Sequence, residues 1–453
     1  MVGAAAGVPG EATRRENPRD TTQNAMSQRE RIAELLAGLP VRVRVEGLGS
    51  ALGPSDADVL LRLRSTRAAI ALASAEIGAF ASCHVEGEVD IEGAMRDLMR
   101  AAAALVGNLP RESRPSLLVR IGQIGASALR HTLTRDAEQI RFHYDVADDF
   151  YALWLDPARV YSCAYFAEPD MSLADAQRAK LALICRKLDL RPGMRLLDIG
   201  CGWGGLVLYA AEHHGVTADG ITLSTDQLAH VEREIARRGL RGRVSVQLLD
   251  YRRIPAEGRY DRVASVGMFE HVGRANMTLY CQRLAALLSP GGWVLNHGIT
   301  AAHPDQRGLG AGIGEFIERY IFPGGELLHV SAIAEHMARG GLEIVDVENL
   351  RPHYAKTLWC WSDALEQRRE EARKALLSRH PPERAERILR AYRLYLAGSA
   401  LGFEQGWMAI HQFLALRPDG DTARGRLRGS QSDYPFRRDY MYLSASDTPP
   451  NSN

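Results

Sequence analysis

The chain has 453 residues, which is enough for two or three domains with a core adequate for independent stability. Hydrophobic residues make up 46% of it and charged residues 25%, as in ordinary soluble globular proteins. The 56 Lys and Arg residues balance the 55 Asp and Glu residues to a net charge of +1, which argues against a nucleic-acid-binding protein. We therefore expect no nucleic-acid partner.

The cysteines and the hydropathy pattern indicate the compartment. Six cysteines are scattered along the chain without a C-x-x-C pair, which favours reduced thiols in a cytoplasmic protein over disulfides or a zinc site. No segment approaches the roughly 18 consecutive apolar residues that span a bilayer. The N-terminal segment is too short and too weakly apolar for a signal peptide. Any membrane contact is therefore expected to be peripheral, and we expect no metal site.

The first quarter of the chain predicts a small domain. Residues 1–26 are polar and predict disorder, and Met26 is a candidate start because an N-cap serine and an amphipathic pattern follow it. Alternation at 41–45 and an apolar run at 59–65 predict strands, and 90–106 predicts a helix. We interpret 27–125 as a small α/β domain without a catalytic constellation.

The pattern changes from about residue 135. Residues 143–156 are rich in aromatic side chains and predict a helix, as does the segment 170–190. Apolar runs separated by helical patterns follow at 195–200, 216–224, 244–250, 260–268 and 291–299. Strands alternating with helices predict a mostly parallel sheet covered on both faces, with its ligand at the carboxyl ends of the strands.

Two later segments complete the predicted catalytic domain, residues 135–415. Residues 306–327 are rich in glycine and then in aromatic residues, and their length predicts an active-site lid. Alternating charges at 362–393 predict a solvated helical arm at about 360–395. Residues 416–453 form a C-terminal tail that we expect to be partly disordered.

The segment LLDIGCGWGG at 196–205 carries the strongest chemical signal. An apolar strand runs into a turn in which glycines let the backbone approach a ligand closely. The turn lacks the Lys-Ser/Thr of a P-loop. The spacing of Asp198, Gly200, Gly202 and Gly204 fits an S-adenosylmethionine (SAM) methyltransferase better than a dinucleotide fold. We therefore predict an α/β class I SAM-dependent methyltransferase: a Rossmann-like, mostly parallel seven-stranded sheet with a small N-terminal α/β domain.

The ends of two further strands fit the same cofactor. Thr222, Leu223 and Gln227 follow the second strand, where an acidic residue often binds the ribose, and a neutral glutamine can still bind hydroxyls. Asp250 and Tyr251 close the third strand, where they suit the amino group and the face of adenine. Each pattern alone also fits an ordinary turn after a strand.

Eight motifs in order make the resemblance specific: YSCAYF (161–166), LLDIGCGWGG (196–205), GITLS (220–224), DYR (250–252), SVGMFEHVG (265–273), HGIT (297–300), YIFPGGEL (320–327) and HYAKTL (353–358). Together they resemble the cyclopropane-fatty-acyl-phospholipid synthase family, which includes the mycolic acid cyclopropane synthases. The resemblance covers roughly 135–415. The N-terminal domain, with GEVDIEG at 87–93, resembles the lipid-engaging domain of the bacterial members.

The resemblance implies a reaction and its site. The SAM methyl would go to a cis double bond of an unsaturated phospholipid acyl chain, and loss of a proton would close a cyclopropane ring. Such a site must align a weak nucleophile, exclude water and stabilise a carbocation. In the family the base is a bound bicarbonate, and the family positions that hold it are Cys163, Glu270, His297, Ile299 and Tyr354. Tyr161, Ser162 and Tyr144 carry over as SAM contacts.

Several positions depart from the family pattern. Glu404 stands where several members have arginine, GGELL at 324–328 lacks the usual proline, and ADD at 147–149 replaces a Gly-Asn or Ser-Asn/Asp pair. Asp219 lies inside a predicted strand, where an apolar residue is expected. None of these belongs to the bicarbonate set, so they bear on substrate shape and on the lid more than on the chemistry.

Three other functions stay open at this point. A fatty-acyl methyltransferase would share the first step and give a methylene- or methyl-branched chain. A small-molecule amine N-methyltransferase of the coclaurine type shares the fold but needs no carbocation base. A non-catalytic lipid- or SAM-binding protein would leave the site unexplained. We expect a cytoplasmic enzyme that contacts the inner membrane face peripherally. Acyl length, headgroup and a homodimer are not decided by the sequence.

Overall fold

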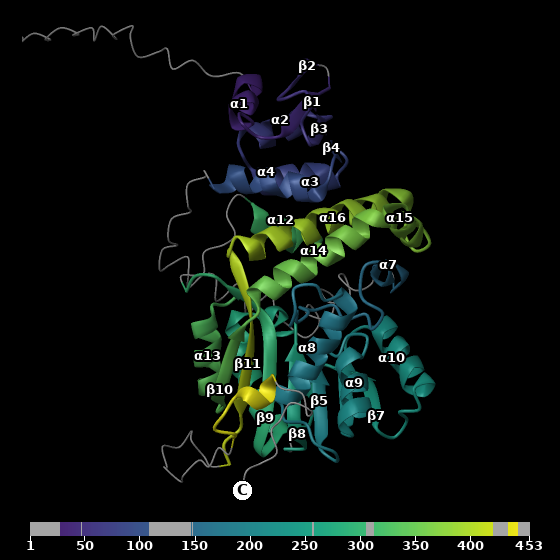
Figure 1. The fold of residues 1–453 in the computed structure, drawn as a ribbon, viewed down its shortest axis with the longest axis vertical. Coiled ribbons are helices and arrows are strands. Elements are labelled where there is room, and N and C mark those ends of the chain that lie inside the picture. The colour runs from purple at the N-terminus through teal and green to yellow at the C-terminus, as the bar shows by residue number, and fades with distance from the viewer. Residues whose placement is uncertain are drawn as a thin grey trace, which may run out of the picture.

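The computed structural model describes residues 28–46, 48–107, 146, 148–255, 258–304, 312–419 and 434–442. The segment 1–26, Tyr144, the last part of the predicted N-terminal domain and most of the tail lie outside the described residues. The described chain forms a small N-terminal domain that is stacked on a larger α/β domain (Figure 1). No helix among these residues has the length and apolar character needed to cross a bilayer.

The N-terminal domain is a four-stranded sheet with helices. Its strand order is β2-β1-β3-β4, with β1 parallel to β3 and the other two pairs antiparallel. Its elements are α1 (Gln28–Leu35), β1 (Val41–Val45), β2 (Leu48–Leu52), β3 (Val59–Leu63), α2 (Thr66–Ala73), α3 (Ile77–Val85), β4 (Val89–Glu92) and α4 (Met95–Gly107). Both predicted strands are confirmed. The predicted helix at 90–106 begins only at Met95, because Val89–Glu92 pairs with β3 as an edge strand.

The larger domain contains the predicted seven-stranded sheet, in the order β10-β11-β9-β8-β5-β6-β7. The strands are β5 (Arg195–Ile199), β6 (Thr217–Thr222), β7 (Val244–Leu248), β8 (Tyr260–Val266), β9 (Leu288–Ala301), β10 (Glu343–Asn349) and β11 (Met408–Leu416). All pairs are parallel except those of β11, which runs antiparallel to both β9 and β10. The mostly parallel class I architecture is therefore confirmed.

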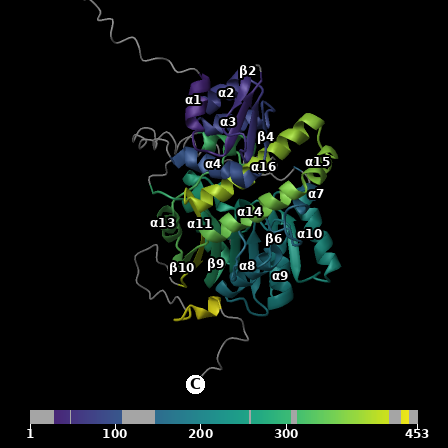
Figure 2. The same cartoon turned by 45° about the horizontal axis from the view of Figure 1, so that its top comes forward.

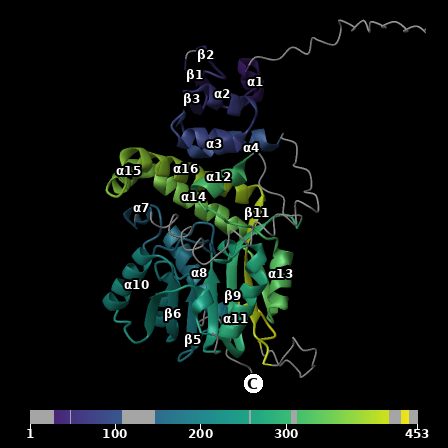
Figure 3. The same ribbon diagram turned by 180° about the vertical axis from the view of Figure 1, so that it is seen from behind.

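Helices cover both faces of this sheet, and each face has its own apolar core (Figure 3). One core joins the sheet to α8 (Leu173–Lys187), α9 (Gly205–His214) and α10 (Thr225–Arg237). The other joins it to α11 (Met277–Leu287) and α13 (Val330–Arg339). Within the described part of the aromatic-rich segment 143–156, α7 (Asp148–Ala152) is helical, and its Phe150 and Tyr151 are fully buried.

Three helices lie between the sheet and the N-terminal domain (Figures 1 and 2): α14 (Arg351–Gln367), α16 (Pro382–Glu404) and the short α12 (Ile313–Tyr320). A further helix, α15 (Arg369–Leu377), connects α14 to α16. The prediction of a solvated arm is wrong for α16, which is buried along most of its length. Two of its arginines form ion pairs at the domain interface: Arg390 pairs with Asp90, and Arg387 pairs with Glu86, the residue directly after α3.

The N-terminal domain also packs closely on α12. A Cβ atom on Gly78 of α3 would lie 1.9 Å from the carbonyl oxygen of Gly312, directly before α12. Tyr320, at the end of α12, donates a hydrogen bond of 3.0 Å to Glu86. Of the predicted lid at 306–327, α12 therefore rests against the N-terminal domain, whereas Glu326 bonds to the catalytic domain: its amide donates to the Glu270 carbonyl at 3.1 Å and its carboxylate accepts the Arg274 amide at 2.8 Å.

Candidate active site

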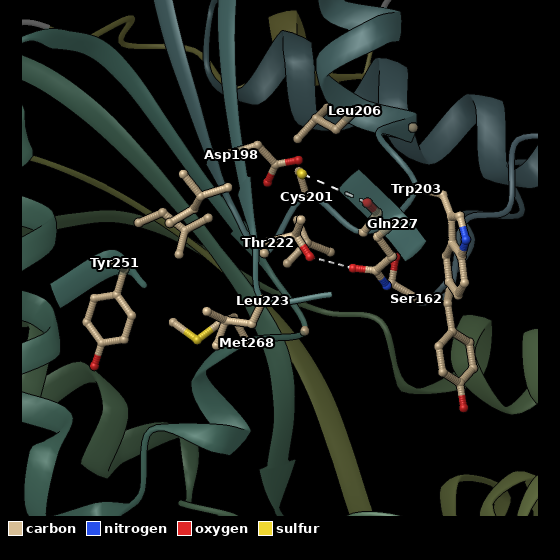
Figure 4. Close-up of a pocket in the computed structure, with 18 of the residues that line it drawn as sticks. Ser162, Asp198, Cys201, Trp203, Leu206, Thr222, Leu223, Gln227, Tyr251 and Met268 are labelled. Carbon is tan, nitrogen blue, oxygen red and sulfur yellow. Dashed lines mark hydrogen bonds between the residues drawn. The ribbon is translucent and has the colours of Figure 1, made fainter. Parts of the chain in front are cut away.

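A cavity of about 140 Å³ opens at the carboxyl ends of β5, β6 and β8, beside the glycine loop (Figure 4). We call it the glycine-loop cavity. Its lining includes most of the residues predicted to bind SAM: Tyr161, Ser162, Asp198, Gly200, Gly202, Thr222, Leu223, Gln227, Asp250 and Tyr251. The structure thus brings these residues from four separated segments to one cavity.

Gly204 does not line the cavity, and the structure gives it a different role. It caps the N-terminus of α9 with φ of 83°, in the left-handed region that favours glycine. A Cβ atom there would lie 2.9 Å from Cγ2 of Val231 on α10. Gly204 therefore allows the turn and its close packing, while Gly200 and Gly202 form the cavity wall.

Asp198 is the acidic group of the cavity. Its side chain is buried at the end of β5, and its Oδ1 atom has no hydrogen-bond partner among the described residues. Burial raises the pKa of Asp198 to about 7, and the positive charge of Lys180 opposes this shift. A buried acceptor without a partner fits a cationic group of a ligand.

The polar side chains after β6 and β7 differ in the hydrogen bonds that they already form within the protein. Thr222 donates a hydrogen bond of 2.7 Å to Oε1 of Gln227, which orients this buried amide. Asp250 accepts bonds from the backbone and side chain of Arg252, at 2.7 to 2.9 Å. Its carboxylate is therefore engaged, whereas the Tyr251 ring, packed edge-on against Tyr280, supplies an aromatic surface.

The segment around Tyr161 and Ser162 is anchored by α8. Gln177 donates to the carbonyl oxygens of Val160 and Ser162, and the ammonium of Lys180 donates to the Ser162 hydroxyl at 2.9 Å. Lys180 also lines the cavity, although sequence reasoning did not select it. The hydroxyl of Tyr161 donates a 3.3 Å bond to Tyr395 of α16.

The five residues predicted to hold bicarbonate are joined by a chain of contacts outside the glycine-loop cavity. Ile299 pairs with Ile410 across β9 and β11, and the Ile410 carbonyl accepts a bond from the Leu350 amide. The Leu350 carbonyl in turn accepts the amide of Tyr354 at 3.1 Å and lies 3.9 Å from Sγ of Cys163.

Glu270 and His297 complete the set. Oε1 of Glu270 accepts the Ile299 amide at 2.7 Å, whereas its buried Oε2 has no partner in the described chain. Burial raises the pKa of Glu270 to about 7. His297 lies two residues before Ile299 on the same face of β9, and burial holds its pKa well below the usual value.

The tautomer of His297 follows from its neighbour. The amide nitrogen of Gln412 lies 3.0 Å from Nδ1 of His297. An amide N–H can only donate, so Nδ1 accepts and the proton of the neutral ring lies on Nε2. This Nε2–H has no partner among the described residues. The cluster therefore presents one buried acceptor, on Glu270, and one buried donor, on His297.

A second, apolar cavity of about 160 Å³ lies between the N-terminal domain, α12 and α16, and we call it the interdomain cavity. Its walls include Phe80, Met99, Phe316 and Leu401. Tyr395 also lines it and accepts the bond from Tyr161 of the glycine-loop cavity. A hydrogen-bonded pair of tyrosines therefore connects the linings of the two cavities.

The structure shows what two of the residues that depart from the family pattern contact. Glu404 accepts a 2.6 Å hydrogen bond from Nε1 of Trp359. Asp219 is partly exposed and accepts bonds from Ser245 on β7, at 2.6 Å, and from Arg195 on β5, at 3.2 Å. Neither residue lines the glycine-loop cavity.

Comparisons with known proteins agree with this geometry. The family model for mycolic acid cyclopropane synthetase matches residues 131–413. A probable fatty acid methyltransferase of Pseudomonas putida is 43% identical over 405 residues, 89% of this chain and 96% of that protein. The mycolic acid cyclopropane synthase CmaA1, solved with SAH and CTAB, is 36% identical with a TM-score of 0.57, over 62% of this chain and 98% of that one. Coclaurine N-methyltransferase, at 21% identity and a TM-score of 0.59 over 75% of this chain and 99% of that one, shares the fold.

The fold and the glycine-loop cavity thus define a class I SAM-dependent methyltransferase. Within that class, the family match covers more than half of the chain. The chain belongs to the mycolic acid cyclopropane synthetase family.

Proposed function

We propose that this enzyme transfers the SAM methyl group to the cis double bond of an unsaturated phospholipid acyl chain and closes a cyclopropane ring. The observation that carries the proposal is that two buried atoms, Glu270 Oε2 and His297 Nε2, have no hydrogen-bond partner among the described residues. An amine N-methyltransferase has no need for such a pair, because its nucleophile already carries a lone pair.

The residues of the cluster fit a bicarbonate ion. A bicarbonate has one O–H donor and negatively charged oxygens that accept. Glu270 offers an acceptor, and His297 offers a donor that its neutral tautomer fixes in place. Tyr354 adds a phenol, and the buried Cys163, with burial raising the pKa of its thiol, remains uncharged. When bound, bicarbonate would supply the base that takes the proton from the added methyl group.

The chain itself contributes orientation and the exclusion of water. Oε1 of Glu270 is fixed by the Ile299 amide, so Oε2 can direct a ligand hydroxyl. The ring centroids of Tyr161, Trp154 and Trp361 lie within 6 Å of one another, and Tyr161 lines the glycine-loop cavity. Their faces suit a developing carbocation without offering a strong nucleophile. The buried setting keeps water, a competing nucleophile, from the reacting carbons.

The interdomain cavity supports an acyl substrate. It is almost entirely apolar, and it meets the glycine-loop cavity at Tyr395 and Tyr161. An acyl chain placed there would reach the methyl donor from the side of the N-terminal domain, for which we propose a lipid-engaging role. The enzyme would then act as a cytoplasmic protein that contacts the inner membrane face peripherally.

A second candidate, methylation without ring closure, is favoured by one comparison: the relative from Pseudomonas putida bears the name probable fatty acid methyltransferase. Both reactions begin with the same methyl transfer. They differ in what happens to the cation: direct loss of a proton from the added methyl group closes the ring, whereas a 1,2-hydride shift that moves the cation to the methylated carbon, followed by loss of a methyl proton, leaves a methylene branch.

Incubation of the purified enzyme with methyl-labelled SAM and vesicles of cis-unsaturated phospholipid, with and without bicarbonate, separates these functions. A labelled ring, seen by mass spectrometry and high-field proton NMR and reduced without bicarbonate, is the expected result. A labelled methylene branch would support the fatty-acyl methyltransferase. Absence of lipid labelling in protein that binds SAH would overturn both.

A further inference from the structure

A buried lysine on α8 lies in the wall of the glycine-loop cavity. The side chain of Lys180 is buried, and its Nζ atom donates one hydrogen bond, to Oγ of Ser162 at 2.9 Å. An ammonium carries three N–H donors, and among the described residues Lys180 uses one of them. Lys180 therefore has donor capacity left beside a ligand cavity.

The titratable groups that face this ammonium do not neutralise it at close range. They are Asp156, Asp198 and the thiols of Cys163 and Cys185, whose pKa burial raises, and no carboxylate of the described chain forms an ion pair with Lys180. The carboxylate oxygens of Asp156 already accept the amides of residues 158 and 160. Burial lowers the pKa of Lys180 to about 8. A buried cation without a paired anion is unfavourable unless a ligand supplies the anion.

The hydroxyl group of Ser162 links the Lys180 ammonium to the surface of the cavity. Because its oxygen accepts from Lys180, its own O–H proton must point to another acceptor, and no acceptor for it is found in the described part of the chain. Ser162 lines the cavity, as does Asp198, whose Oδ1 has no hydrogen-bond partner in the described part of the chain (Figure 4). The cavity thus contains two hydrogen-bond donors, the Lys180 ammonium and the Ser162 hydroxyl, and a separate acceptor, the Asp198 carboxylate.

This combination matches the two ends of an α-amino acid. We propose that Lys180 is a positioning residue that recognises the carboxylate of the methionine portion of SAM, through Ser162 and its own remaining N–H groups, while Asp198 faces the ammonium. The inference rests on SAM dependence and is independent of the lipid substrate. Lys180 would then make the enzyme prefer ligands that carry the methionine carboxylate over ligands that lack it.

The test compares two ligands and needs no lipid. Isothermal calorimetry measures the affinity of SAH and of decarboxylated SAH for the wild type, for Lys180→Met and for the matched control Lys187→Met. Lys187 is a buried lysine of the same helix, but it pairs with Glu348 away from the cavity. We expect the wild type and the control to prefer SAH at least tenfold, and Lys180→Met to lose that preference.

A purely structural lysine would give a different pattern. Lys180→Met would then weaken both ligands by the same factor, and this result would overturn the proposal. Equal affinity of the wild type for the two ligands would overturn it as well, and that measurement requires no variant. If Lys180→Met does not fold, Ser162→Ala tests the same recognition, because it removes the hydroxyl between Lys180 and the ligand. This variant is expected to reduce the preference for SAH at least threefold. An unchanged preference for SAH in Ser162→Ala would contradict recognition of the carboxylate through Ser162.

Discussion

The carboxylate of Glu270 is held on one side only, by the backbone amide of Ile299. The bond between Oε1 and this amide is 2.7 Å long, and the equally buried Oε2 has no partner among the described residues. The amide fixes the direction of the free oxygen, and burial raises the pKa of the carboxyl group to about 7. Glu270 is therefore preorganised to accept one hydrogen bond from the hydroxyl of a neighbouring ligand.

Glu270→Gln is expected to lower turnover by about a hundredfold or more, because a positioned base contributes about 10² to 10⁴ and Glu270 orients the proposed one. The amide keeps the size of the side chain but cannot accept from a ligand hydroxyl with the strength of a carboxylate. SAH affinity should change less than threefold, because Glu270 does not line the glycine-loop cavity. Glu335→Gln, an exposed residue on α13, is the control. Full turnover in Glu270→Gln would remove Glu270 from the mechanism.

The same variant changes how stability depends on pH. The pKa of Glu270 is about 7 in the folded protein and about 4.5 unfolded, so the folded state holds the proton more tightly. Its stabilising contribution is complete below pH 4.5 and is lost as the pH rises through 7. At about 1.4 kcal/mol per pKa unit, the loss approaches about 3 kcal/mol.

Glu270→Gln does not titrate, so its stability relative to the wild type should rise by up to about 3 kcal/mol between pH 5 and pH 8. Urea unfolding of the ligand-free proteins at the two pH values measures this difference. Asp198 titrates in both proteins and cancels in the comparison. A difference independent of pH would show that the carboxyl group is not strained by burial.

A third prediction concerns Gln412, which fixes the tautomer of His297. In Gln412→Leu the Nδ1 atom of His297 loses its donor, and the proton is no longer confined to Nε2. We expect turnover to fall at least tenfold and the bicarbonate concentration for half-maximal rate to rise. Gln412→Glu is the informative companion, because a carboxylate favours the opposite tautomer and should be at least as damaging. Equal bicarbonate dependence in both variants and the wild type would refute this role.

The sequence alone predicted the parts of the molecule that rest on local patterns. The glycine loop and the strand ends at Asp198 and Thr222 were recognised because alternating strands and helices bring such ends to one edge of a sheet. Lys180 and Gln412 were missed because their roles depend on partners distant in the chain. Lys180 occurs in a helical pattern where lysine is ordinarily a surface residue, and its partner Ser162 lies 18 positions away.

Two errors of interpretation have the same origin. The alternating charges of α16 predicted a solvated arm, yet Arg387 and Arg390 pair with acidic residues of the N-terminal domain about 300 positions earlier. Asp219 was unexplained because its partner Ser245 belongs to the neighbouring strand β7. Charge patterning shows that polar groups need partners, and only the tertiary fold shows whether water or another domain provides them.

The last prediction tests whether the interdomain cavity carries the acyl chain. Gly398 on α16 lines this cavity, and a Cβ atom there would have no neighbour within 4 Å. A leucine can therefore enter the cavity without a backbone clash, and replacing a helical glycine should stabilise the protein by up to about 1 kcal/mol.

We expect Gly398→Leu to lower the rate on long-chain phospholipid vesicles at least tenfold and to leave SAH affinity unchanged. Gly398→Ala gives the same helical gain but adds only one carbon to the cavity, so its rate should stay within threefold of the wild type. Loss of activity in both variants would point to α16 rather than to the cavity. Full activity of a folded Gly398→Leu variant would mean that the acyl chain follows another path to the methyl donor.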